Sequence, residues 1–339
     1  MKKLKERLDG NSFLLLITIA LFIVLYVSGM VIFGDKNFGK PQVFFNLFIN
    51  NAGLIVAAVG MTMVLITGGI DISIGSVIGM TCMLLAWMIE VQQMSVISSI
   101  VIALVIGGIF GLVQGYFIAY LKIQPFIVTL AGMFFARGMT AVISSNMISI
   151  TNSTFLSMAN SKLYIPFFVT VNKKGNLVYP YIYPSVVIAI IVLVLVFLLL
   201  KFTSFGRSIY AVGGNEQSAL LMGLNVRKTK LKVYILNGFL AGLAGFVFSL
   251  NSCGGFVEQA RGFEMEAIAS SVIGGTLLTG GVGSVVGSLF GVLIKGTIES
   301  IITFQGTLSS WWTKIVIATL LGFFIILQSV LAKIKLKKK

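Results

Sequence analysis

Asp71 is the residue of this sequence whose setting most demands a chemical explanation. It follows Gly68 and Gly69, it precedes Ser73, and no other charged residue lies in the apolar run around it. A carboxylate there is costly unless it meets water, a polar partner or a membrane boundary, and a glycine break in such a run is typical of a discontinuous helix. We predict a hinge, in which Asp71 ties the turn by accepting backbone N–H bonds or else contacts a small molecule directly.

A second stretch near the other end repeats this pattern. Gly280 and Gly281 precede the sequence GSVVG, much as Gly68 and Gly69 precede GSVIG. A break frees backbone N–H and C=O groups that are costly in hydrocarbon. We therefore predict that both hinges are buried or line a water-filled route. The candidate residues of the second hinge are Glu264, Glu266, Gly274, Gly275, Gly280 and Gly281.

A polar stretch between apolar segments carries the pattern of a short helix. Asn215 is a favoured N-cap residue, Glu216 lies in the first turn, where the helix dipole favours an acid, and Gly223 is a typical stop. A helix of about eight residues is marginal alone in water, so we expect it to rest on something. It is either a connector on the membrane surface or a lever that a soluble partner moves. The candidate coupling residues are Gly213, Gly214, Asn215, Glu216, Ala219 and Gly223.

The sequence lacks the residues of the common enzyme chemistries. It contains no histidine and two cysteines, Cys82 and Cys253, which lie in or beside apolar segments. We therefore expect no metal site of the usual ligands, no histidine-assisted nucleophile and no disulfide. It also lacks the phosphate-binding pattern G-x-x-x-x-G-K-[ST]. We predict a transporter that is not an enzyme, binds no cofactor itself and takes its energy from elsewhere.

The composition indicates an integral membrane protein. Of 339 residues, 57% are hydrophobic and 10% are charged, whereas a soluble domain has roughly 25% charged residues. About ten apolar segments approach the roughly 20 residues that cross a bilayer, and the first is too long for a signal peptide. We predict an all-α, multi-pass fold embedded in lipid. The segments have approximate limits 12–33, 43–67, 74–90, 95–121, 125–143, 184–200, 233–252, 264–280, 283–304 and 312–331.

The basic residues predict the orientation and account for the net charge of +15 without a nucleic-acid partner. Sixteen would lie in the cytoplasm if both termini do: Lys2, Lys3, Lys5, Arg7, Lys122, Lys201, Arg207, Arg227, Lys228, Lys230, Lys232, Lys333, Lys335, Lys337, Lys338 and Lys339. Six would lie outside, namely Lys36, Lys40, Lys162, Lys173, Lys174 and Arg261, with Arg137, Lys295 and Lys314 inside segments. Asp71 and Ser73 would then lie at the cytoplasmic mouth of a route, and Glu264 and Glu266 at its outer mouth.

We treat residues 1–339 as one transmembrane domain with two larger connections. The external loop, about 144–183, contains an apolar patch at 163–171 and is either a lid packed on the outer face or a docking surface for an external partner. The cytoplasmic loop, about 202–232, contains the candidate coupling residues.

Glycines also bear on how the helices pack. Gly107, Gly111 and Gly115 recur every four residues, and this pattern favours close packing between spans over direct contact with substrate. Segment 264–280 opens with two acids and is interrupted by glycines, so it either spans the membrane or is re-entrant.

Three long motifs resemble one family of transport proteins. They are GGIDISIGSVIG, RSIYAVGGNEQSALLMGLNV and FEMEAIASSVIGGTLLTGGVGSVVGSLFG, in that order. From about residue 12 to 331 the chain is similar to the permease subunits of bacterial ribose-type simple-sugar ABC importers. GGTLLTGGVG and FQGTLSSWWTKIVI look most like the galactofuranose permease branch, while Ile72 stands where most relatives have Leu.

The resemblance implies partners as well as a function. In that family two permeases in the bacterial inner membrane form the pore, two cytoplasmic ATPase subunits bind the ATP, and an extracytoplasmic binding protein delivers the sugar. Residues 213–223 would be the coupling helix, and the second permease would be either an identical or a different chain. The alternative is a secondary transporter of a small polar solute, with a midplane site between the two hinges. Such a transporter has no required role for the 213–223 helix.

Overall fold

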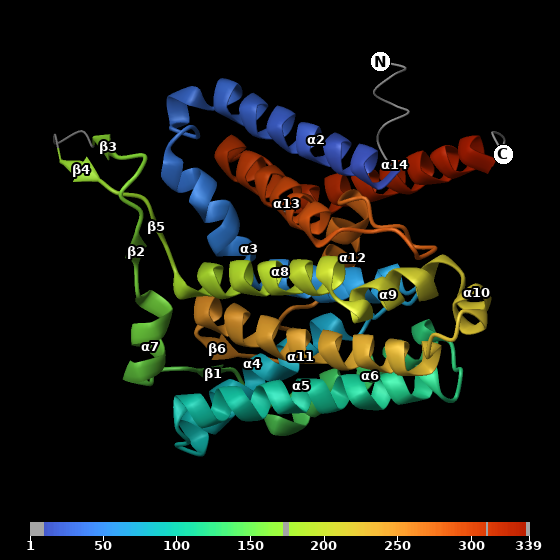
Figure 1. The fold of residues 1–339 in the computed structure, drawn as a ribbon. Helices are drawn as coiled ribbons and strands as arrows, with labels where there is room; N and C mark the ends of the chain where they lie inside the picture. The colour runs from blue at the N-terminus through green and yellow to red at the C-terminus, as the bar shows by residue number, and fades with distance from the viewer. Residues whose placement is uncertain (1–9, 172–175, 310, 337–339) are drawn as a thin grey trace.

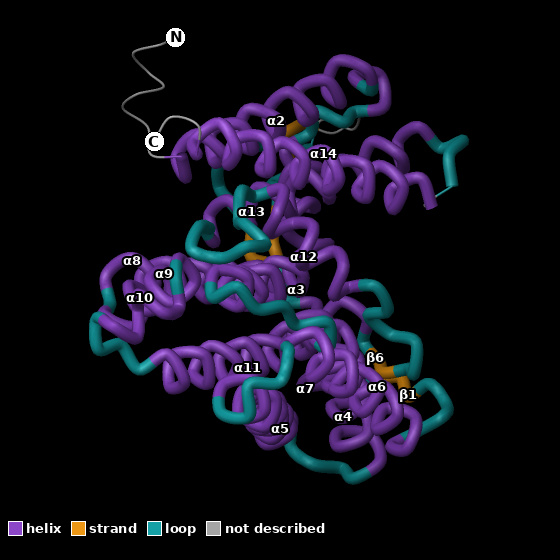
Figure 2. The backbone as a smooth tube through the Cα atoms, turned by 90° about the vertical axis from the view of Figure 1, so that its right-hand side faces the viewer, coloured by secondary structure: helices purple, strands orange, loops and turns teal. Residues whose placement is uncertain are grey.

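The computed structural model describes residues 10–171, 176–309 and 311–336, and it shows a bundle of helices with a few short strands (Figures 1 and 2). The basic residues Lys2, Lys3, Lys5, Arg7, Lys173, Lys174, Lys337, Lys338 and Lys339 lie outside the described residues. Among the described residues, eight helices are long and apolar enough to cross a membrane, so the predicted all-α, multi-pass fold is confirmed. They are α2 (Gly10–Ile32), α3 (Pro41–Ile66), α4 (Ile74–Ala86) with the π-helical turn η2 (Trp87–Val91), α5 (Val96–Ala119), α6 (Pro125–Ile143), α8 (Pro184–Phe202), α11 (Val226–Ser252) and α13 (Val285–Gln305).

Two further helices account for the remaining predicted segments. These are α12 (Phe263–Ile273) and α14 (Trp311–Leu336), and both pack against α13. At 1.5 Å per residue, the 11 residues of α12 span about 16 Å, about half of a hydrocarbon core of about 30 Å. The open question about segment 264–280 is thereby answered: it is a half-length helix followed by a glycine-rich loop.

The bundle has two distinct ends (Figure 1). One carries the short helices α9 (Ser204–Gly214) and α10 (Glu216–Leu221), and α2 begins and α14 ends there; we call it the α10 end. The other, the α7 end, carries α7 (Ser153–Asn160), the 3-10 turn η1 (Gly34–Lys36) and most of the strands. In the predicted orientation the α10 end faces the cytoplasm.

The external loop divides into two parts. Its first part is fixed to the bundle, because the Glu90 carboxylate accepts hydrogen bonds from the Thr151 and Asn152 backbone N–H groups at 2.8 Å, and because Phe155 of α7 is buried. The strands are antiparallel pairs: β1 (Ile148–Ser149) with β6 (Gly254–Gly255), β2 (Leu163–Tyr164) with β5 (Tyr181–Ile182), and β3 (Thr170–Val171) with β4 (Leu177–Val178). The apolar patch stays exposed, with Phe167 and Phe168 both 69% accessible. The prediction of a lid packed on the outer face therefore holds only for the first part of the loop.

Helix α3 forms the centre of the core. From Asn51 to Ile66 every residue of α3 is buried, as expected for a helix that is apolar on all sides. A single large hydrophobic cluster reaches from Phe22 of α2 to Phe324 of α14. The outer helices expose apolar side chains such as Val101 and Leu195, which suit contact with lipid.

The glycine stripe of α5 packs against α11, as predicted. A Cβ atom added to Gly107 would lie 2.5 Å from the Gly238 carbonyl oxygen, and one added to Gly238 would lie 2.8 Å from the Cα atom of Gly111. Backbones this close leave no room for a side chain, so the stripe is a packing surface.

Two elements interrupt the bundle in opposite halves. After α3 ends at Ile66, residues 67–73 form a turn and an irregular stretch at the α10 end, and α4 then runs to the α7 end. After α11 ends at Ser252, residues 253–262 are largely irregular, and α12 then runs toward the α10 end, where the Cβ position of Gly274 lies 2.5 Å from the backbone of Ser288 near the start of α13. Each interruption joins a long helix to a shorter one.

Candidate functional site

The two predicted hinges meet each other and the end of α9. Gly281 donates its N–H to the Ile66 carbonyl oxygen at 2.8 Å. A Cβ atom added to Gly280 would lie 2.9 Å from the Gly213 carbonyl oxygen and 3.0 Å from the Gly68 Cα atom. We call this cluster the glycine junction; its members are Gly68, Gly213, Gly214, Gly280 and Gly281. It joins the first break, the α12–α13 loop and α9 by direct backbone contact.

The junction requires glycine for two reasons. Gly68, Gly280 and Gly281 have φ angles of 75°, 86° and 76°, in the left-handed region that other residues rarely adopt. Gly213 instead lies against the Ile66 carbonyl oxygen, where an added Cβ atom would overlap it. A side chain at Gly213, Gly280 or Gly281 would therefore push the segments apart, whereas Gly68 needs glycine for its left-handed backbone alone and Gly214 has open space around it.

The other predicted hinge glycines lie outside the junction. A Cβ atom on Gly69 would lie 2.6 Å from the Tyr234 hydroxyl group of α11. Gly274 packs against Gly287 of α13, and Gly275 lies next to Leu14 of α2. These three glycines are packing positions around the junction.

The predicted coupling segment is two helices instead of one. Asn215 has an extended backbone, so α9 ends at Gly214, and the Asn215 side chain accepts the Ser218 N–H bond at 2.8 Å to begin α10. Gly223 has a φ of 79° and ends the segment. The predicted N-cap at Asn215, with Glu216 in the first turn, is confirmed; the coupling helix does not cover all of 213–223, because Gly213 and Gly214 belong to α9 and α10 has six residues.

Helix α10 presents one face to the bundle and one outward. Ala219 is fully buried in a small cluster with Val212 and Val226, while Leu221 is 89% exposed. Glu216 forms an ion pair of 2.6 Å with Lys230. The predicted loop boundaries of 202–232 are too wide, because Phe202 ends α8 and residues from Val226 onward already form the polar first turns of α11, which hydropathy alone does not mark as helix.

Asp71 is the centre of a buried hydrogen-bond network (3% exposed). Its Oδ1 atom accepts bonds from the Ser73 N–H and hydroxyl groups at 2.8 and 2.6 Å, and its Oδ2 atom accepts one from the Asn237 amide at 2.6 Å. Ser73 in turn accepts a bond of 2.9 Å from Gln114 of α5. The carboxylate thus ties the first break to α11 and α5.

The second break is held by Arg137 of α6. Its guanidinium group donates to the carbonyl oxygens of Val257 and Gln259 at 2.9 and 2.8 Å. Glu264 opens α12 next to Gly75 of α4, and its Oε2 atom is buried without a hydrogen-bond partner among the described residues.

Glu266 belongs to a different network. The Lys295 ammonium group of α13, whose side chain is 9% exposed, lies 3.3 Å from Glu266 and 2.6 Å from Glu299. It also donates to the Asn51 amide oxygen of α3 at 3.2 Å. The structure thus places the two acids predicted at one outer mouth in separate networks.

One ion pair is exposed at the depth of the spans. Glu258 and Arg261 lie 2.8 Å apart, with side chains 59% and 77% exposed. The neighbouring Ala260 carbonyl oxygen would lie 3.0 Å from a Cβ atom on Gly75, in the first turn of α4, and about 17 Å of helix separates Gly75 from the end of α4 at Ala86, toward the α7 end. The expectation that Arg261 lies outside the spans is therefore wrong, because the chain folds back after α11. Charges at this depth face water or a polar partner.

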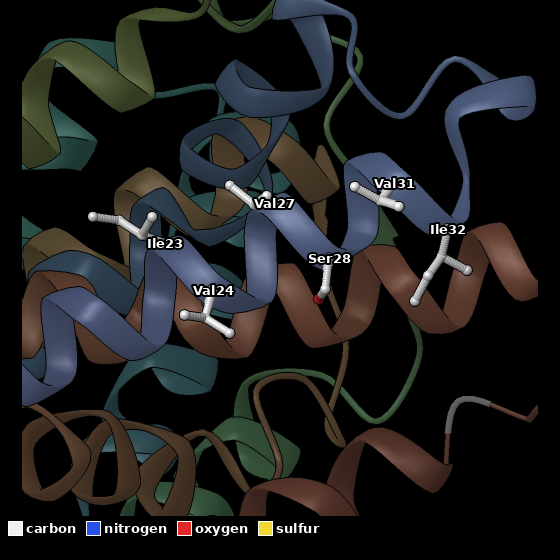
Figure 3. A pocket seen from close by; sticks show the side chains of 6 residues that line it. All are labelled: Ile23, Val24, Val27, Ser28, Val31 and Ile32. Carbon is white, nitrogen blue, oxygen red and sulfur yellow. The ribbon is translucent and has the colours of Figure 1, made fainter.

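A hollow of about 420 Å³ on α2 is lined almost entirely by apolar side chains (Figure 3). Its only polar side chain, Ser28, donates its hydroxyl to the Leu25 carbonyl oxygen at 2.8 Å. The lining residues are Ile23, Val24, Val27, Ser28, Val31 and Ile32. Such an apolar surface suits lipid, the environment that the sequence predicts for the outer helices.

Sequence reasoning missed most partners of the predicted site residues. Asn237 and Gln114 belong to the Asp71 network. Arg137 holds the second break, and Lys295 and Asn51 belong to the network of Glu266. A signal was available, because a charged or amide side chain within an apolar segment is itself a functional candidate. The pairing among them depends on helix contacts that periodicity alone does not reveal.

Comparisons with known proteins give a consistent family. The family model described as "Branched-chain amino acid transport system / permease component" matches residues 43–325. The chain is 43% identical over 314 residues to the inner membrane ABC transporter permease protein YjfF of Escherichia coli K12, covering 93% of this chain and 91% of that protein. It is 33% identical to the fructose import permease protein FruG of Bifidobacterium longum (95% and 92% covered) and 33% identical to the ribose import permease protein RbsC of E. coli K12 (89% and 89% covered).

No solved structure matches the chain. The family match covers most of the sequence, including both breaks, the glycine junction and the α9–α10 segment. This multi-pass inner-membrane protein therefore belongs to the family of branched-chain amino acid transport system permease components.

Proposed function

We propose that this chain is the permease subunit of an ABC importer that carries a small neutral sugar into the cell. The relatives named for import carry fructose or ribose, and they align with 95% and 89% of this chain. The chain itself would form the pore, and ATP would be bound by separate cytoplasmic ATPase subunits. A second permease, identical or different, would complete the pore, and an extracytoplasmic binding protein would deliver the sugar.

The glycine junction is the observation that carries this proposal. A permease without its own ATPase needs a mechanical connection from its cytoplasmic surface to its route. Leu221 on α10 provides an exposed apolar contact, and Gly213 at the end of α9 touches Ile66, the last residue of α3. Movement of α9 and α10 therefore reaches the first break and the α12–α13 loop through backbone contact. A secondary transporter, the alternative reading, would give α10 no role.

The exposed ion pair supports a route along α12. Glu258 and Arg261 lie in the second break, and Met265 in the first turn of α12, just after it in the sequence, is 54% exposed. A polar face at this depth is explained if it borders water between this chain and a second permease. Phe167 and Phe168 at the α7 end provide an exposed apolar surface on the side where a binding protein would dock.

The more specific proposal is that the sugar is galactofuranose or a related monosaccharide. Its support is the resemblance of GGTLLTGGVG and FQGTLSSWWTKIVI to the galactofuranose branch. The first motif forms the loop from α12 to α13 and the second leads into α14. Both therefore lie on elements that surround α13.

The test is transport by the complete complex. The permease is reconstituted in proteoliposomes with its cognate ATPase, second permease and binding protein, and ATP-dependent uptake of radiolabelled D-galactose, D-ribose, D-fructose and L-leucine is measured. We expect uptake of D-galactose, whose solutions contain a furanose fraction. Uptake of ribose or fructose alone would refute the galactofuranose assignment but keep sugar import. Uptake of leucine without any sugar would refute the proposed function.

A further inference from the structure

A polar cavity of about 400 Å³ lies between α3, α13 and α14, away from the glycine junction. Its volume falls within the about 300–1,000 Å³ of small-molecule sites. Polar side chains come from all three helices: Asn46, Asn50 and Asn51 from α3, Glu299 and Ser300 from α13, and Thr313 from α14. Three asparagines on one face of a membrane helix are costly against lipid, so this face meets water or a polar ligand.

The floor of the cavity is a fixed network. The Asn51 amide nitrogen donates to the Leu47 carbonyl oxygen at 2.9 Å, and its oxygen accepts from Lys295 at 3.2 Å. A Cβ atom on Gly296 would lie 2.7 Å from the Asn51 amide nitrogen, so glycine leaves the space that this amide occupies. The floor is therefore held in one arrangement before any ligand arrives.

Side chains in the walls of the cavity have polar groups that could form hydrogen bonds with a ligand. Asn50 and Ser300 make no side-chain hydrogen bond within the part of the chain that the structure describes. Glu299 bonds Lys295 through Oε1 only, and its side chain is 38% exposed. Amide, hydroxyl and carboxylate groups together can donate to and accept from hydroxyl groups, which do both.

The charge of the cavity argues against an ionic ligand. The Lys295 ammonium group lies between the carboxylates of Glu266 and Glu299, so it offsets the attraction that either acid would exert on a cation. The remaining negative charge opposes an anion. A neutral ligand with several hydroxyl groups matches this balance best.

The cavity lies in the half of the bundle toward the α7 end. Its lining includes Val43, two residues after α3 begins, and Phe304, whose carbonyl oxygen accepts a 2.6 Å bond from Lys36 of η1. In the predicted orientation this is the outer side, where a binding protein would release its cargo. Lys295 links the cavity floor to Glu266 in the first turn of α12.

From these observations we infer that this cavity is a low-affinity binding site for a neutral, monosaccharide-sized polyol entering from outside. The inference rests on the proposed function and adds a place for the sugar within this chain. Asn50 and Ser300 bind hydroxyl groups at the wall, and Glu299 accepts hydroxyl hydrogen bonds from the ligand. The Lys295 network then connects occupancy of the cavity to the start of α12.

Cysteine protection in the assembled complex tests the inference. Thr303→Cys at the cavity lining, in a Cys253→Ser background, is treated in spheroplasts with a membrane-impermeant maleimide, with and without D-galactose, D-ribose or D-fructose. We expect labelling from outside and protection by at least one of the three sugars. Absence of labelling, which means that lipid or the second permease seals the cavity, would overturn the inference. Labelling that no sugar slows would overturn it as well.

A second substitution separates binding from folding. Adding Asn50→Ala should raise the sugar concentration for half-protection about threefold to tenfold, the effect of one lost hydrogen bond. Ser28→Ala on the lipid-facing hollow of α2 is the matched control and should leave that concentration unchanged. An unchanged value for Asn50→Ala would contradict the assigned contact. Protection of the cysteine does not require transport. A complex that imports no sugar but shows protection would therefore refute the proposed function and leave the binding site in place.

Discussion

Replacing Asp71 is the sharpest test of the first break. In Asp71→Ala the Ser73 N–H group and the Asn237 amide lose their acceptor in a buried site, whereas the Ser73 hydroxyl can turn to the Gln114 oxygen 3.4 Å away. An unsatisfied buried donor costs about 1–3 kcal/mol, so two cost about 2–6 kcal/mol of folding free energy. We expect a clearly lower midpoint of thermal unfolding for the purified permease.

Two conservative variants sharpen the test. Asp71→Asn keeps an acceptor for the Ser73 N–H group, and the Asn237 amide can rotate to offer its oxygen, which has no hydrogen-bond partner among the described residues. Its unfolding midpoint should therefore lie close to that of the wild type. Ser73→Ala removes only the hydroxyl donor and should cost about 1 kcal/mol.

The assay pairs stability with transport. Unfolding midpoints are measured by intrinsic fluorescence in detergent, and sugar uptake is measured in the assembled complex and normalised to the amount of permease. An Asp71→Ala protein that folds, assembles and transports like the wild type would refute both the structural role and direct contact with the sugar. Normal stability of Asp71→Asn with lost uptake would instead show direct contact.

Three further predictions test the orientation, the coupling and the packing. Cysteine placed at Lys36 should react with an impermeant maleimide from outside, and cysteine at Lys228 only after permeabilisation; external labelling at Lys228 would invert the topology. Leu221→Asp should abolish sugar uptake and stimulation of the ATPase by the loaded binding protein without lowering thermal stability, because this side chain is 89% exposed. Gly107→Val should destabilise the protein by about 1–3 kcal/mol through overpacking, and Gly108→Val, where an added Cβ atom meets nothing within 4 Å, should not; equal unfolding midpoints would contradict the α5–α11 contact.

The sequence was sufficient to predict the class of fold and the two glycine-marked breaks, at Gly68-Gly69 and Gly280-Gly281, but not the break at 253–262. Apolar segment length and the sparse charges predicted the helices, because crossing a bilayer fixes both. The Gly68-Gly69 and Gly280-Gly281 pairs marked breaks because left-handed backbone favours glycine. Segment length and glycine position are properties of short stretches of sequence, so they can be predicted without knowing which distant segments make contact.

Contacts between distant segments could not be predicted in this way. Nothing in the spacing of Gly213 indicates that it lies against Ile66, or that Arg137 of α6 holds the carbonyl groups of Val257 and Gln259. Arg261 was assigned to the outside because hydropathy assumes that a chain leaving a span stays outside. The irregular stretch after α11 instead runs back beside α4 as far as its first turn.

The positions of the ties indicate that the first break and the α12–α13 loop move together. Asp71 joins the first break to α11, the same helix whose end continues into the second break, while Arg137 ties the second break to α6. The loop after α12 returns to the first break at the glycine junction, where Gly281 donates to Ile66. Since the backbones touch there without side chains between them, a displacement of α9 moves both segments at once. A route that such a displacement opens at the first break is therefore altered at the α12–α13 loop in the same step.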